Sequence, residues 1–303
     1  MLKLRPNQFC NQPININSMN ILITGASGQL GNEIRIETQE NNRKNKYFFT
    51  GRSDIDITNK REIEEFVKAN NIEIIVNCAA YTNVDMAEDD TESAYLLNDT
   101  AVKYLADTTK KHNVFLIHIS TDYVFNGKNC IPYKEQDTPN PESIYGKSKL
   151  AGEKHILQSQ AGLIIRTSWL YSSFGKNFVK TISKLADEKN ELKVVYDQVG
   201  SPTYARDLAK CILKIIDEDF QNHTGEIYHF ANEGVCSWYD LAKEVSNQLE
   251  FDCKIYPVES KDFPTKAKRP PYSVFNKEKI KNHFKCEIPY WKDSLKEMLA
   301  SLR

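Results

Sequence analysis

The sequence predicts an α/β protein with a doubly wound parallel sheet and a smaller C-terminal lobe. Two observations predict this fold class. From Met19 onward, short apolar or β-branched runs alternate with amphipathic segments, and a glycine-rich loop, TGASGQLG, joins the first run to the first amphipathic segment. This order is typical of a parallel sheet that is covered by helices on both faces.

The elements of the first domain follow one another in a regular order. Strands are expected at MNILIT, YFFT, IEIIVNCAA, VFLIHIS and GLIIRT, which occupy 19–24, 47–50, 72–80, 114–120 and 162–167. Helices are expected near 29–40, 60–70 and 91–112, and a fourth begins at IYGKSK. At least five strands therefore belong to one domain, at 19–170.

After Arg166 the alternation is less regular. Helices near 175–188, 204–217 and 237–249 are separated by short strand patterns at LKVV, EIYHFA and CKIYPV. We expect 171–303 to form mainly a second lobe, while segments at about 195–235 return to the first domain. Residues 1–18 are rich in Asn and Gln and are expected to be a disordered extension.

The overall charge excludes several classes of partner. The 303 residues contain 40 Lys and Arg against 41 Asp and Glu, a formal net charge of −1, so no global field favours nucleic acid or an anionic membrane. No apolar run approaches the roughly 18 residues of a membrane span, and the N-terminus lacks the apolar stretch of a signal peptide. We therefore expect a cytoplasmic protein that binds anions only at a local site.

Seven cysteines are scattered through the chain without CxxC spacing. An odd number cannot form a complete set of disulfides, and several of the cysteines lie in apolar runs. We expect reduced thiols that serve packing, and none is predicted to be catalytic.

The loop TGASGQLG has the spacing GxxGxxG and lies directly between a strand and a helix. Gly25 can make the tight turn after the strand, Gly28 lets the backbone approach a pyrophosphate, and Gly31 lets the helix pack closely. Amides at the start of the helix then face the phosphates. The loop predicts a dinucleotide site that includes Gly25, Ser27, Gly28, Gln29 and Leu30.

The end of the second strand should approach the adenosine ribose. Arg52 follows this strand and could pair with a 2′-phosphate, which favours NADPH, although Asp54 leaves NADH open and Arg52 could also be a solvated loop residue. Asp56 and Ile57 are candidates for adenine recognition. Ala79, Ala80 and Tyr81, which follow the third strand, are expected to lie against the cofactor; a plain loop or N-cap role is nearly as compatible with these residue types.

Tyr145 and Lys149 stand four residues apart in the predicted helix and therefore share one face. A free phenol is a weak acid at pH 7, and a nearby ammonium lowers its pKa. Tyr145 can then protonate a ketone oxygen while a hydride reaches the carbon. Lys149 could also hold the nicotinamide ribose, whereas Lys147 is assigned to solvent.

The fourth strand ends in Ser120, Thr121, Asp122 and Tyr123, at the sheet edge where ligands bind in open α/β sheets. A hydroxyl at this position could donate to a substrate carbonyl and orient Tyr145. Thr121 is preferred to Ser120, which faces the other side of the strand if the two alternate. Asp122 and Tyr123 are candidates for the substrate pocket, or for capping and packing the strand end.

With these residues placed, the chain resembles the extended short-chain dehydrogenases/reductases, which are Rossmann-like, and more narrowly the dTDP-4-dehydrorhamnose reductase family. The resemblance runs from Met19 to the C-terminus, and its more diagnostic motifs are TGASGQLG, NCAAYTNVDMAE, STDYVFNG, YGKSKLAGE, RTSWLY, DQVGSPTY and RPPYSVFN. It implies an NAD(P)-binding domain at 19–170 and a substrate-binding lobe at 171–303. The implied reaction is reduction by NAD(P)H of the C4 ketone of a dTDP-linked 4-keto-6-deoxy sugar, giving dTDP-L-rhamnose.

The resemblance also implies roles for individual residues. Thr121, Tyr145 and Lys149 form the catalytic set, and Asn98 matches the helix Asn found near the active site of the family. Residues implied to contact the nucleotide-sugar substrate are Thr82, Val84, Tyr123, Trp169 and, for the diphosphate, Arg269. Trp169 could instead be a buried packing residue, and Arg269 could form a surface ion pair.

Two further expectations follow. Family members that form magnesium-linked dimers match Glu33 but have a second acid where this chain has Arg206. No magnesium requirement is therefore expected, and the oligomeric state is expected to be a monomer or homodimer.

The rival interpretations are a reductase or epimerase of another nucleotide sugar, and a non-catalytic regulatory subunit like that of methionine adenosyltransferase. The intact set of Thr121, Tyr145 and Lys149 favours catalysis.

Overall fold

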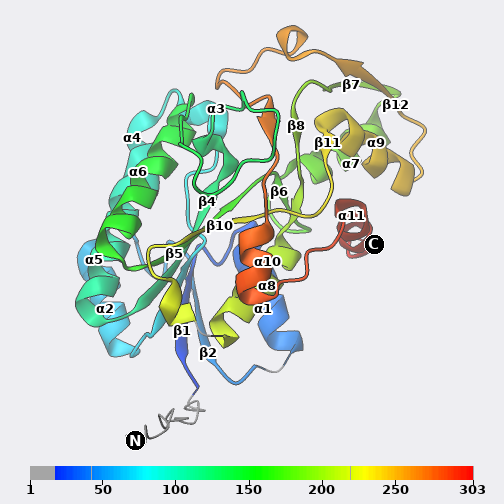
Figure 1. The fold of residues 1–303 in the computed structure, drawn as a ribbon. Helices are drawn as coiled ribbons and strands as arrows, with labels where there is room; N and C mark the ends of the chain where they lie inside the picture. Colours follow the sequence, from blue (N-terminus) through cyan, green and yellow to red (C-terminus); the bar gives the residue numbers. More distant parts are fainter. Residues whose placement is uncertain (1–17, 42, 219, 303) are drawn as a thin grey trace, which may run out of the picture.

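The computed structural model describes residues 18–41, 43–218 and 220–302. The predicted disordered extension therefore lies outside the described residues, apart from Ser18. A six-stranded sheet stands at the centre, with all neighbouring strands parallel and the order β10-β5-β4-β3-β1-β2 (Figure 1). Its strands are β1 (Asn20–Thr24), β2 (Lys46–Thr50), β3 (Ile74–Asn77), β4 (Phe115–Thr121), β5 (Gly162–Thr167) and β10 (Ile227–Phe230).

The strand order contains the reversal that positions a ligand site. The chain passes from β1 to β2 on one side, and then continues from β3 to β5 on the other side of β1. Loops on either side of such a reversal diverge and leave a crevice at the carboxyl ends of the strands. The glycine loop follows β1 and the NCAAYT loop follows β3, so both loops border this crevice, and they meet where Gly25 lies against Ala79.

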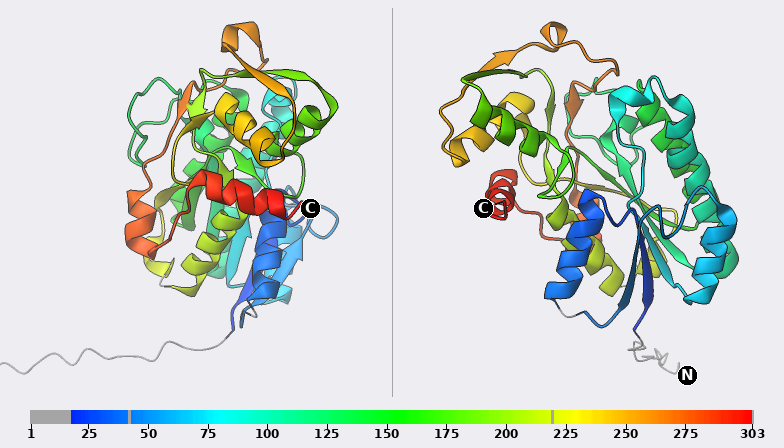
Figure 2. Two further views of the ribbon diagram at one scale, coloured as in Figure 1. Left: turned by 90° about the vertical axis from the view of Figure 1, so that its right-hand side faces the viewer. Right: turned by 180° about the vertical axis from the view of Figure 1, so that it is seen from behind.

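Helices cover both faces of the sheet, as the fold class requires (Figures 1 and 2). Successive side chains of a strand point to opposite faces, so Ile21 and Ile23 pack into one core cluster and Leu22 into another. The first cluster includes residues of α1 (Gln29–Glu40), α8 (Ala205–Asp217) and α10 (Glu278–Phe284). The second includes residues of α2 (Lys60–Ala69), α5 (Ala101–His112) and α6 (Ile144–Ser159).

A smaller lobe lies beyond the carboxyl edge of the sheet, at the upper right of Figure 1. Its core cluster joins α7 (Phe178–Glu188), α9 (Trp238–Gln248), α11 (Trp291–Ala300) and the parallel pair β7 (Glu191–Val195) and β12 (Lys254–Val258). Short strands link it to the sheet domain: β6 (Leu170–Tyr171) with β9 (Thr203–Tyr204), and β8 (Val199–Gly200) with β11 (Cys236–Ser237) and β13 (Tyr272–Ser273). Because β10 joins the central sheet after the chain has visited this lobe, the two parts are interleaved.

One predicted helix is not α-helical along its whole length. The expected helix at 91–112 consists of α4 (Thr91–Tyr95), a π-helical segment (Leu96–Thr100) and α5. The wider turn places the buried Asn98 against the loop after β3: its Oδ1 accepts from the Tyr81 amide at 2.9 Å, and its Nδ2 donates to the Tyr81 carbonyl at 3.0 Å. A π turn at this position is therefore associated with a side chain that fixes a loop of the crevice.

The prediction that all thiols are reduced is wrong for two cysteines. Cys211 on α8 and Cys286 after α10 form a disulfide with their Cα atoms 5.8 Å apart. They are 75 residues apart in the sequence, and only the packing of both helices on the same face of the sheet brings them together. Cys78, Cys130 and the buried Cys236 are free, as expected.

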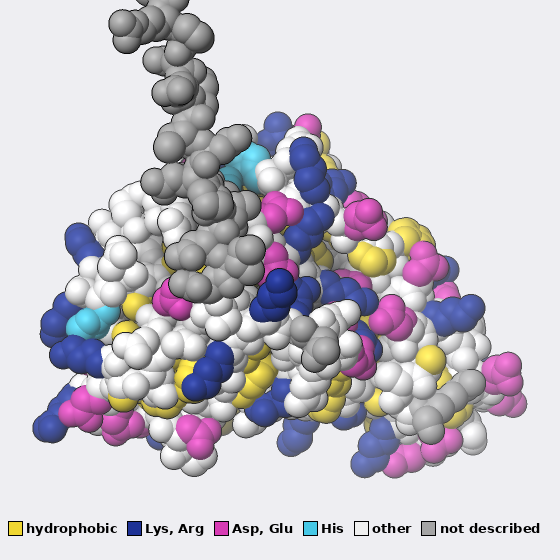
Figure 3. Space-filling model, turned by 90° about the horizontal axis from the view of Figure 1, so that it is seen from below, with side chains coloured by type: hydrophobic (Ala, Val, Ile, Leu, Met, Phe, Trp, Pro, Cys, Tyr) yellow, Lys and Arg dark blue, Asp and Glu magenta, His cyan; other side chains and the backbone are white. Residues whose placement is uncertain are grey.

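The surface agrees with the near-zero net charge. On the face seen in Figure 3, acidic and basic side chains are interspersed and form no single-sign patch. Among the described residues, no helix combines the length and the apolar character that crossing a membrane requires.

Candidate active site

A cavity of about 910 Å³ occupies the crevice at the carboxyl edge of the sheet and extends under the smaller lobe. Every residue that the sequence predicted for cofactor binding, substrate binding or catalysis lines this one cavity. These residues come from the ends of β1 to β5, from the loops and helices that follow these strands, and from the segment that precedes β13. The structure thus brings the predicted residues together, while their individual roles remain predictions.

The glycine loop has the geometry that a pyrophosphate site needs. Gly25 has φ of +65°, and a Cβ on it would lie 2.6 Å from the Ala79 amide nitrogen, so only glycine fits between the two loops. A Cβ on Gly31 would lie 2.5 Å from the Ala26 Cα. The N-cap residue Gly28 has no side-chain cap, and the first turn of α1 contains no acid. Nothing in that turn therefore competes with an anion for the helix N-terminus.

In the loop after β2, the two candidates for ribose recognition, Arg52 and Asp54, differ in their contacts. Asp54 Oδ2 accepts a hydrogen bond from the Gly51 amide at 2.7 Å and so closes its own turn. Arg52 is exposed and lines the cavity. Asp56 Oδ1 accepts from the Thr58 amide and hydroxyl at 2.9 and 2.7 Å, and these bonds lower the pKa of Asp56. Arg52 thus presents a cation at this rim, where both acids are engaged by the loop itself.

The helix with Tyr145 and Lys149 is held tightly against the end of β4. Ser143 caps α6 by accepting from the Gly146 amide at 3.1 Å. A Cβ on Gly146 would lie 2.2 Å from the Tyr123 carbonyl oxygen, so glycine allows this close contact. The Tyr123 and Tyr145 rings meet edge to face at 5.4 Å. Lys147 is exposed, as expected, whereas Lys149 is buried.

The electrostatics of the pair differ from the sequence prediction. Burial raises the pKa of Tyr145 to about 12, with a hydrogen bond to Thr121 acting in the opposite direction. The predicted lowering of this pKa by Lys149 is not found in this structure, where burial has the largest effect on Tyr145. The Lys149 Nζ donates to the Ile119 carbonyl at 2.7 Å and lies 3.3 Å from His118 Nε2. Burial lowers the pKa of Lys149 itself to about 8.

The polar end of β4 provides a hydroxyl and a carboxyl side by side. Thr121 Oγ1 lies 3.0 Å from Asp122 Oδ1 as a hydrogen-bond donor and accepts from the Tyr123 amide at 3.2 Å. Burial raises the pKa of Asp122 to about 7. Near neutral pH this carboxyl can therefore either donate or accept a hydrogen bond.

Trp169 is part of an aromatic stack that sequence reasoning missed. It has a left-handed backbone with φ of +49°, which a bulky residue adopts only when its surroundings enforce it. Its ring stacks on Trp238 with centroids 3.6 Å apart and planes 9° apart. A Cβ on Gly200 would lie 2.7 Å from Trp169 Cε2, so glycine allows the backbone to approach this ring. Trp238 also lines the cavity, but no sequence signal linked it to a residue 69 positions earlier.

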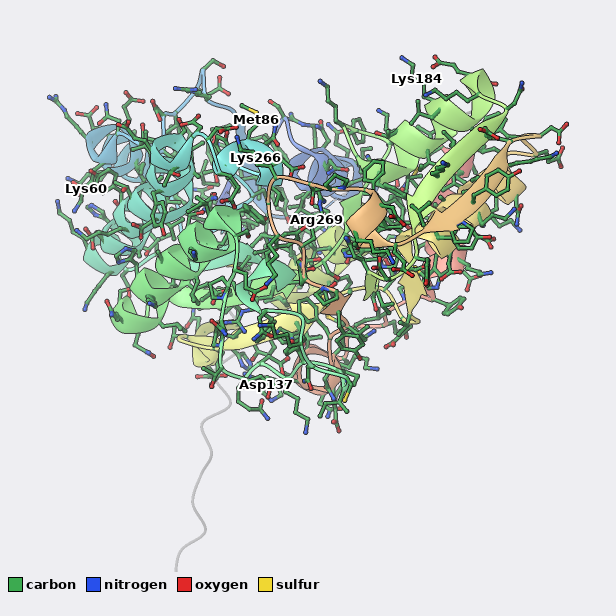
Figure 4. The ribbon with its side chains drawn as sticks, turned by 90° about the horizontal axis from the view of Figure 1, so that it is seen from above. Lys60, Met86, Asp137, Lys184, Lys266 and Arg269 are labelled. Carbon is green, nitrogen blue, oxygen red and sulfur yellow. A yellow bond between two sulfur atoms is a disulfide. The ribbon has the colours of Figure 1, made fainter. Side chains whose placement is uncertain are left out.

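Arg269 lies where the segment before β13 crosses the top of the crevice, close to Lys266 and Met86 (Figure 4). Its guanidinium donates to Asp85 Oδ2 at 2.7 Å, and the Ala267 amide donates to Asp85 Oδ1 at 3.0 Å. Lys266 pairs with Asp89. Hydrogen bonds and ion pairs therefore join this segment, 263–271, to the region around α3 (Val84–Ala87).

Glu33 and Arg206, the two positions that were compared with the magnesium-linked dimers of the family, contact protein groups in this structure. Glu33 is buried and accepts from the Ser172 hydroxyl at 2.7 Å, and burial raises its pKa. Arg206 forms ion pairs with Glu37 and Glu40 on α1. An arginine thus supplies the positive charge beside these acids.

A glycine loop on a parallel sheet whose strand order reverses, with Tyr145 and Lys149 one helical turn apart at the same cavity, defines an extended short-chain dehydrogenase/reductase fold. The chain belongs to the RmlD substrate binding domain family, whose model matches residues 19–303. It is 39% identical over 289 residues to the dTDP-4-dehydrorhamnose reductase of Aggregatibacter actinomycetemcomitans, which covers 92% of this chain and 98% of that protein.

Solved structures agree in both fold and sequence. The dTDP-4-dehydrorhamnose reductase from Clostridium acetobutylicum superposes with a TM-score of 0.89 at 41% identity, over 94% of this chain and 99% of that one. The same reductase from Bacillus anthracis, solved in complex with NADP, gives a TM-score of 0.87 at 36% identity over the same shares of the two chains.

Proposed function

We propose that the protein is an NADPH-dependent reductase that converts the C4 ketone of dTDP-4-dehydro-L-rhamnose to the alcohol of dTDP-L-rhamnose. The observation that supports this most is the single cavity in which Thr121, Tyr145 and Lys149 lie beside the glycine loop. The reductases that are 36 to 41% identical to the chain support the substrate, and the NADP complex supports the cofactor. A cytoplasmic location and a monomeric or homodimeric state remain predictions.

The cofactor fits the residues that are present. The uncapped, acid-free start of α1 would hold the pyrophosphate, and Arg52 would pair with the 2′-phosphate. Asp56 and Ile57 would lie against the adenine. Lys149 would hold the nicotinamide ribose. When bound, NADPH supplies the hydride that adds to the C4 carbon of the sugar.

The residues of this chain supply the proton and its placement. Tyr145 transfers its hydroxyl proton to the C4 oxygen, which becomes an alkoxide-like base as the hydride arrives, so even a phenol of raised pKa can donate. Thr121 orients the carbonyl, and the positive charge of Lys149, one helical turn away, would stabilise the phenolate that forms as the proton leaves. The resulting phenolate recovers a proton from solvent. Asp122, Tyr123 and Trp169 would contact the sugar, Thr82 and Val84 would line its pocket, and Arg269 would bind the diphosphate.

The decisive experiment follows NADPH oxidation by its absorbance with dTDP-4-keto-L-rhamnose as substrate. Tyr145→Phe should lower kcat by about 10²- to 10⁴-fold, the usual contribution of a general acid. Lys149→Met should also lose most activity, while Lys147→Met, on the exposed side of the same helix, is the matched control and should retain it. No turnover by the wild type would refute the proposal and favour a binding role such as that of a regulatory subunit.

The same assay distinguishes reduction from epimerisation and tests the need for a metal. Conversion of a nucleotide sugar without net NADPH consumption would indicate an epimerase. Treatment with EDTA should leave the activity unchanged, because Arg206 stands where a second acidic ligand would be needed. Loss of activity that Mg²⁺ restores would overturn that part of the proposal.

A further inference from the structure

His118 is a buried polar residue of β4 whose role the proposed mechanism leaves open. It is completely buried, at 0% exposure, and its ring lies between the end of β3 and the side chain of Lys149. The Nδ1 atom is 3.0 Å from Asn77 Nδ2, and the Nε2 atom is 3.3 Å from Lys149 Nζ. A fully buried imidazole that touches a catalytic lysine can act on the proton of that lysine.

The contacts of Asn77 determine which nitrogen of the ring carries its proton. Asn77 Oδ1 accepts from the Ala79 amide at 3.2 Å and from the Thr24 hydroxyl at 2.7 Å. A backbone amide can only donate, so the oxygen of Asn77 is fixed on that side and its amide nitrogen faces His118. Nδ1 of His118 must therefore accept, and the neutral ring carries its proton on Nε2.

This tautomer directs a donor at Lys149. A neutral Lys149 can accept a hydrogen bond from Nε2–H of His118 and donate one to the Ile119 carbonyl, so all three groups have a partner. A charged Lys149 keeps the bond to Ile119 but presents an N–H to another N–H. Burial lowers the pKa of His118 well below its usual value, so the ring does not relieve this conflict by becoming an imidazolium.

We propose that His118, fixed as the Nε2–H tautomer by Asn77, is a positioning residue that weakens the hold of Lys149 on its proton; the proposal rests on the proposed reductase function. The other charged and titratable groups that act on Lys149 are Glu153 on its own helix and Cys78 after β3, and both favour the protonated lysine. His118 and burial oppose them. The balance keeps Lys149 charged at neutral pH but able to release its proton a little above it.

The first test is the pH dependence of kcat/KM for reduction. In the wild type, kcat/KM should fall as the pH rises through about 8, since the charged Lys149 is the active form. His118→Asn retains an acceptor for Asn77 but removes the donor that faces Lys149, so the alkaline limb should move upward by roughly one pH unit. A lower kcat/KM with an unmoved limb would show a purely structural role and overturn the proposal.

Asn77→Asp should change the tautomer of His118 while the imidazole itself is kept. A carboxylate at this position would accept a hydrogen bond from Nδ1–H of His118. The neutral ring would then have its lone pair on Nε2 and could accept a hydrogen bond from a charged Lys149. This variant should also shift the limb upward, while its ¹⁵N imidazole shifts should report the Nδ1–H tautomer.

The second test needs neither turnover nor a variant. The ¹⁵N shifts of His118 in the wild-type protein should report a neutral Nε2–H ring from pH 6 to 9, with a change near pH 8 as Lys149 titrates. A Nδ1–H ring or an imidazolium would overturn the proposal even if variants fail to fold. If the wild type does not oxidise NADPH with the sugar but these shifts are observed, the reductase proposal alone has failed.

Discussion

Trp238, the first residue of α9 in the smaller lobe, lies flat against Trp169 after β5, with ring centroids 3.6 Å apart. The stack joins the lobe to the sheet domain at the wall of the cavity. Trp169 has a left-handed backbone conformation, and Gly200 also lies against its ring. The orientation of a proposed sugar contact therefore depends on a residue from the other lobe.

Replacing Trp238 should weaken binding of the nucleotide sugar but not of the cofactor. Stacked aromatic pairs contribute about 0.5–1.5 kcal/mol beyond their buried area, so Trp238→Leu should raise KM for the sugar up to roughly tenfold, with KM for NADPH unchanged. Trp238→Phe retains an aromatic face and should have a smaller effect. Steady-state kinetics with each substrate varied would test this, and equal increases in both KM values would contradict it.

The ion pair between Asp85 and Arg269 should compete with the substrate diphosphate. Both side chains are partly exposed, so the pair is weak, and Asp85→Asn should tighten dTDP binding by about two- to fivefold by releasing Arg269. Asp89→Asn, which removes the partner of Lys266 in the same region, is the control and should change the affinity less. Calorimetric titration with dTDP would measure both, and weaker binding by Asp85→Asn would argue that Asp85 instead orients Arg269.

Cofactor selection should depend on Arg52, the exposed cation at the ribose end of the cavity. Arg52→Ala should lower kcat/KM for NADPH by about 10-fold or more, since charge-assisted bonds to a phosphate contribute roughly 1.5–3 kcal/mol, and should leave NADH almost unaffected. An unchanged ratio of kcat/KM for the two cofactors would show that Arg52 does not pair with the 2′-phosphate.

The fully buried ion pair of Arg166 and Glu153 should be essential to stability as a pair. Their two bonds measure 2.9 and 2.7 Å, and both side chains are at most 1% exposed. Glu153→Gln leaves a buried charge without its counter-ion and should lower the free energy of unfolding by about 3–5 kcal/mol. The double replacement Arg166→Met with Glu153→Met should be less destabilising than the single change. Urea denaturation would measure this, and additive losses would contradict it.

The disulfide between Cys211 and Cys286 should stabilise the protein against unfolding. Closing a loop over a separation of 75 residues reduces the entropy of the unfolded chain by an amount worth about 4 kcal/mol. The variant Cys211→Ser with Cys286→Ser should therefore unfold at lower denaturant concentration, and dithiothreitol should have the same effect on the wild type only. Equal stability of the wild type with and without dithiothreitol would contradict the expected stabilisation.

The sequence was informative wherever a local pattern determines the contact. Alternation predicted the strands, and the glycine spacing predicted a loop whose Gly25 adopts the required positive φ. The features that were missed depend on residues far apart in the chain. Trp238 meets Trp169, Cys286 meets Cys211, and His118 meets Asn77 only after the sheet and both lobes have assembled.

The direction of the pKa shift at Tyr145 could not be predicted from the sequence for a related physical reason. Spacing places Tyr145 and Lys149 on one face of α6, but the sign of a pKa shift depends on how deeply each group is buried. Burial opposes the charged form of both groups, and the surroundings that bury them come from β4 and the loop after β3. A pattern within ten residues contains no information about that environment.

The late entry of β10 into the central sheet has a consequence for engineering. A gene divided after Leu170 would produce an N-terminal fragment without its edge strand and without α8, which covers one face of the sheet. A chimera of two homologues with a single crossover at that point would pack β10 and α8 of one parent against the sheet of the other. Chimeras of this enzyme architecture would need exchange of discontinuous blocks, with 205–230 kept together with the amino-terminal half.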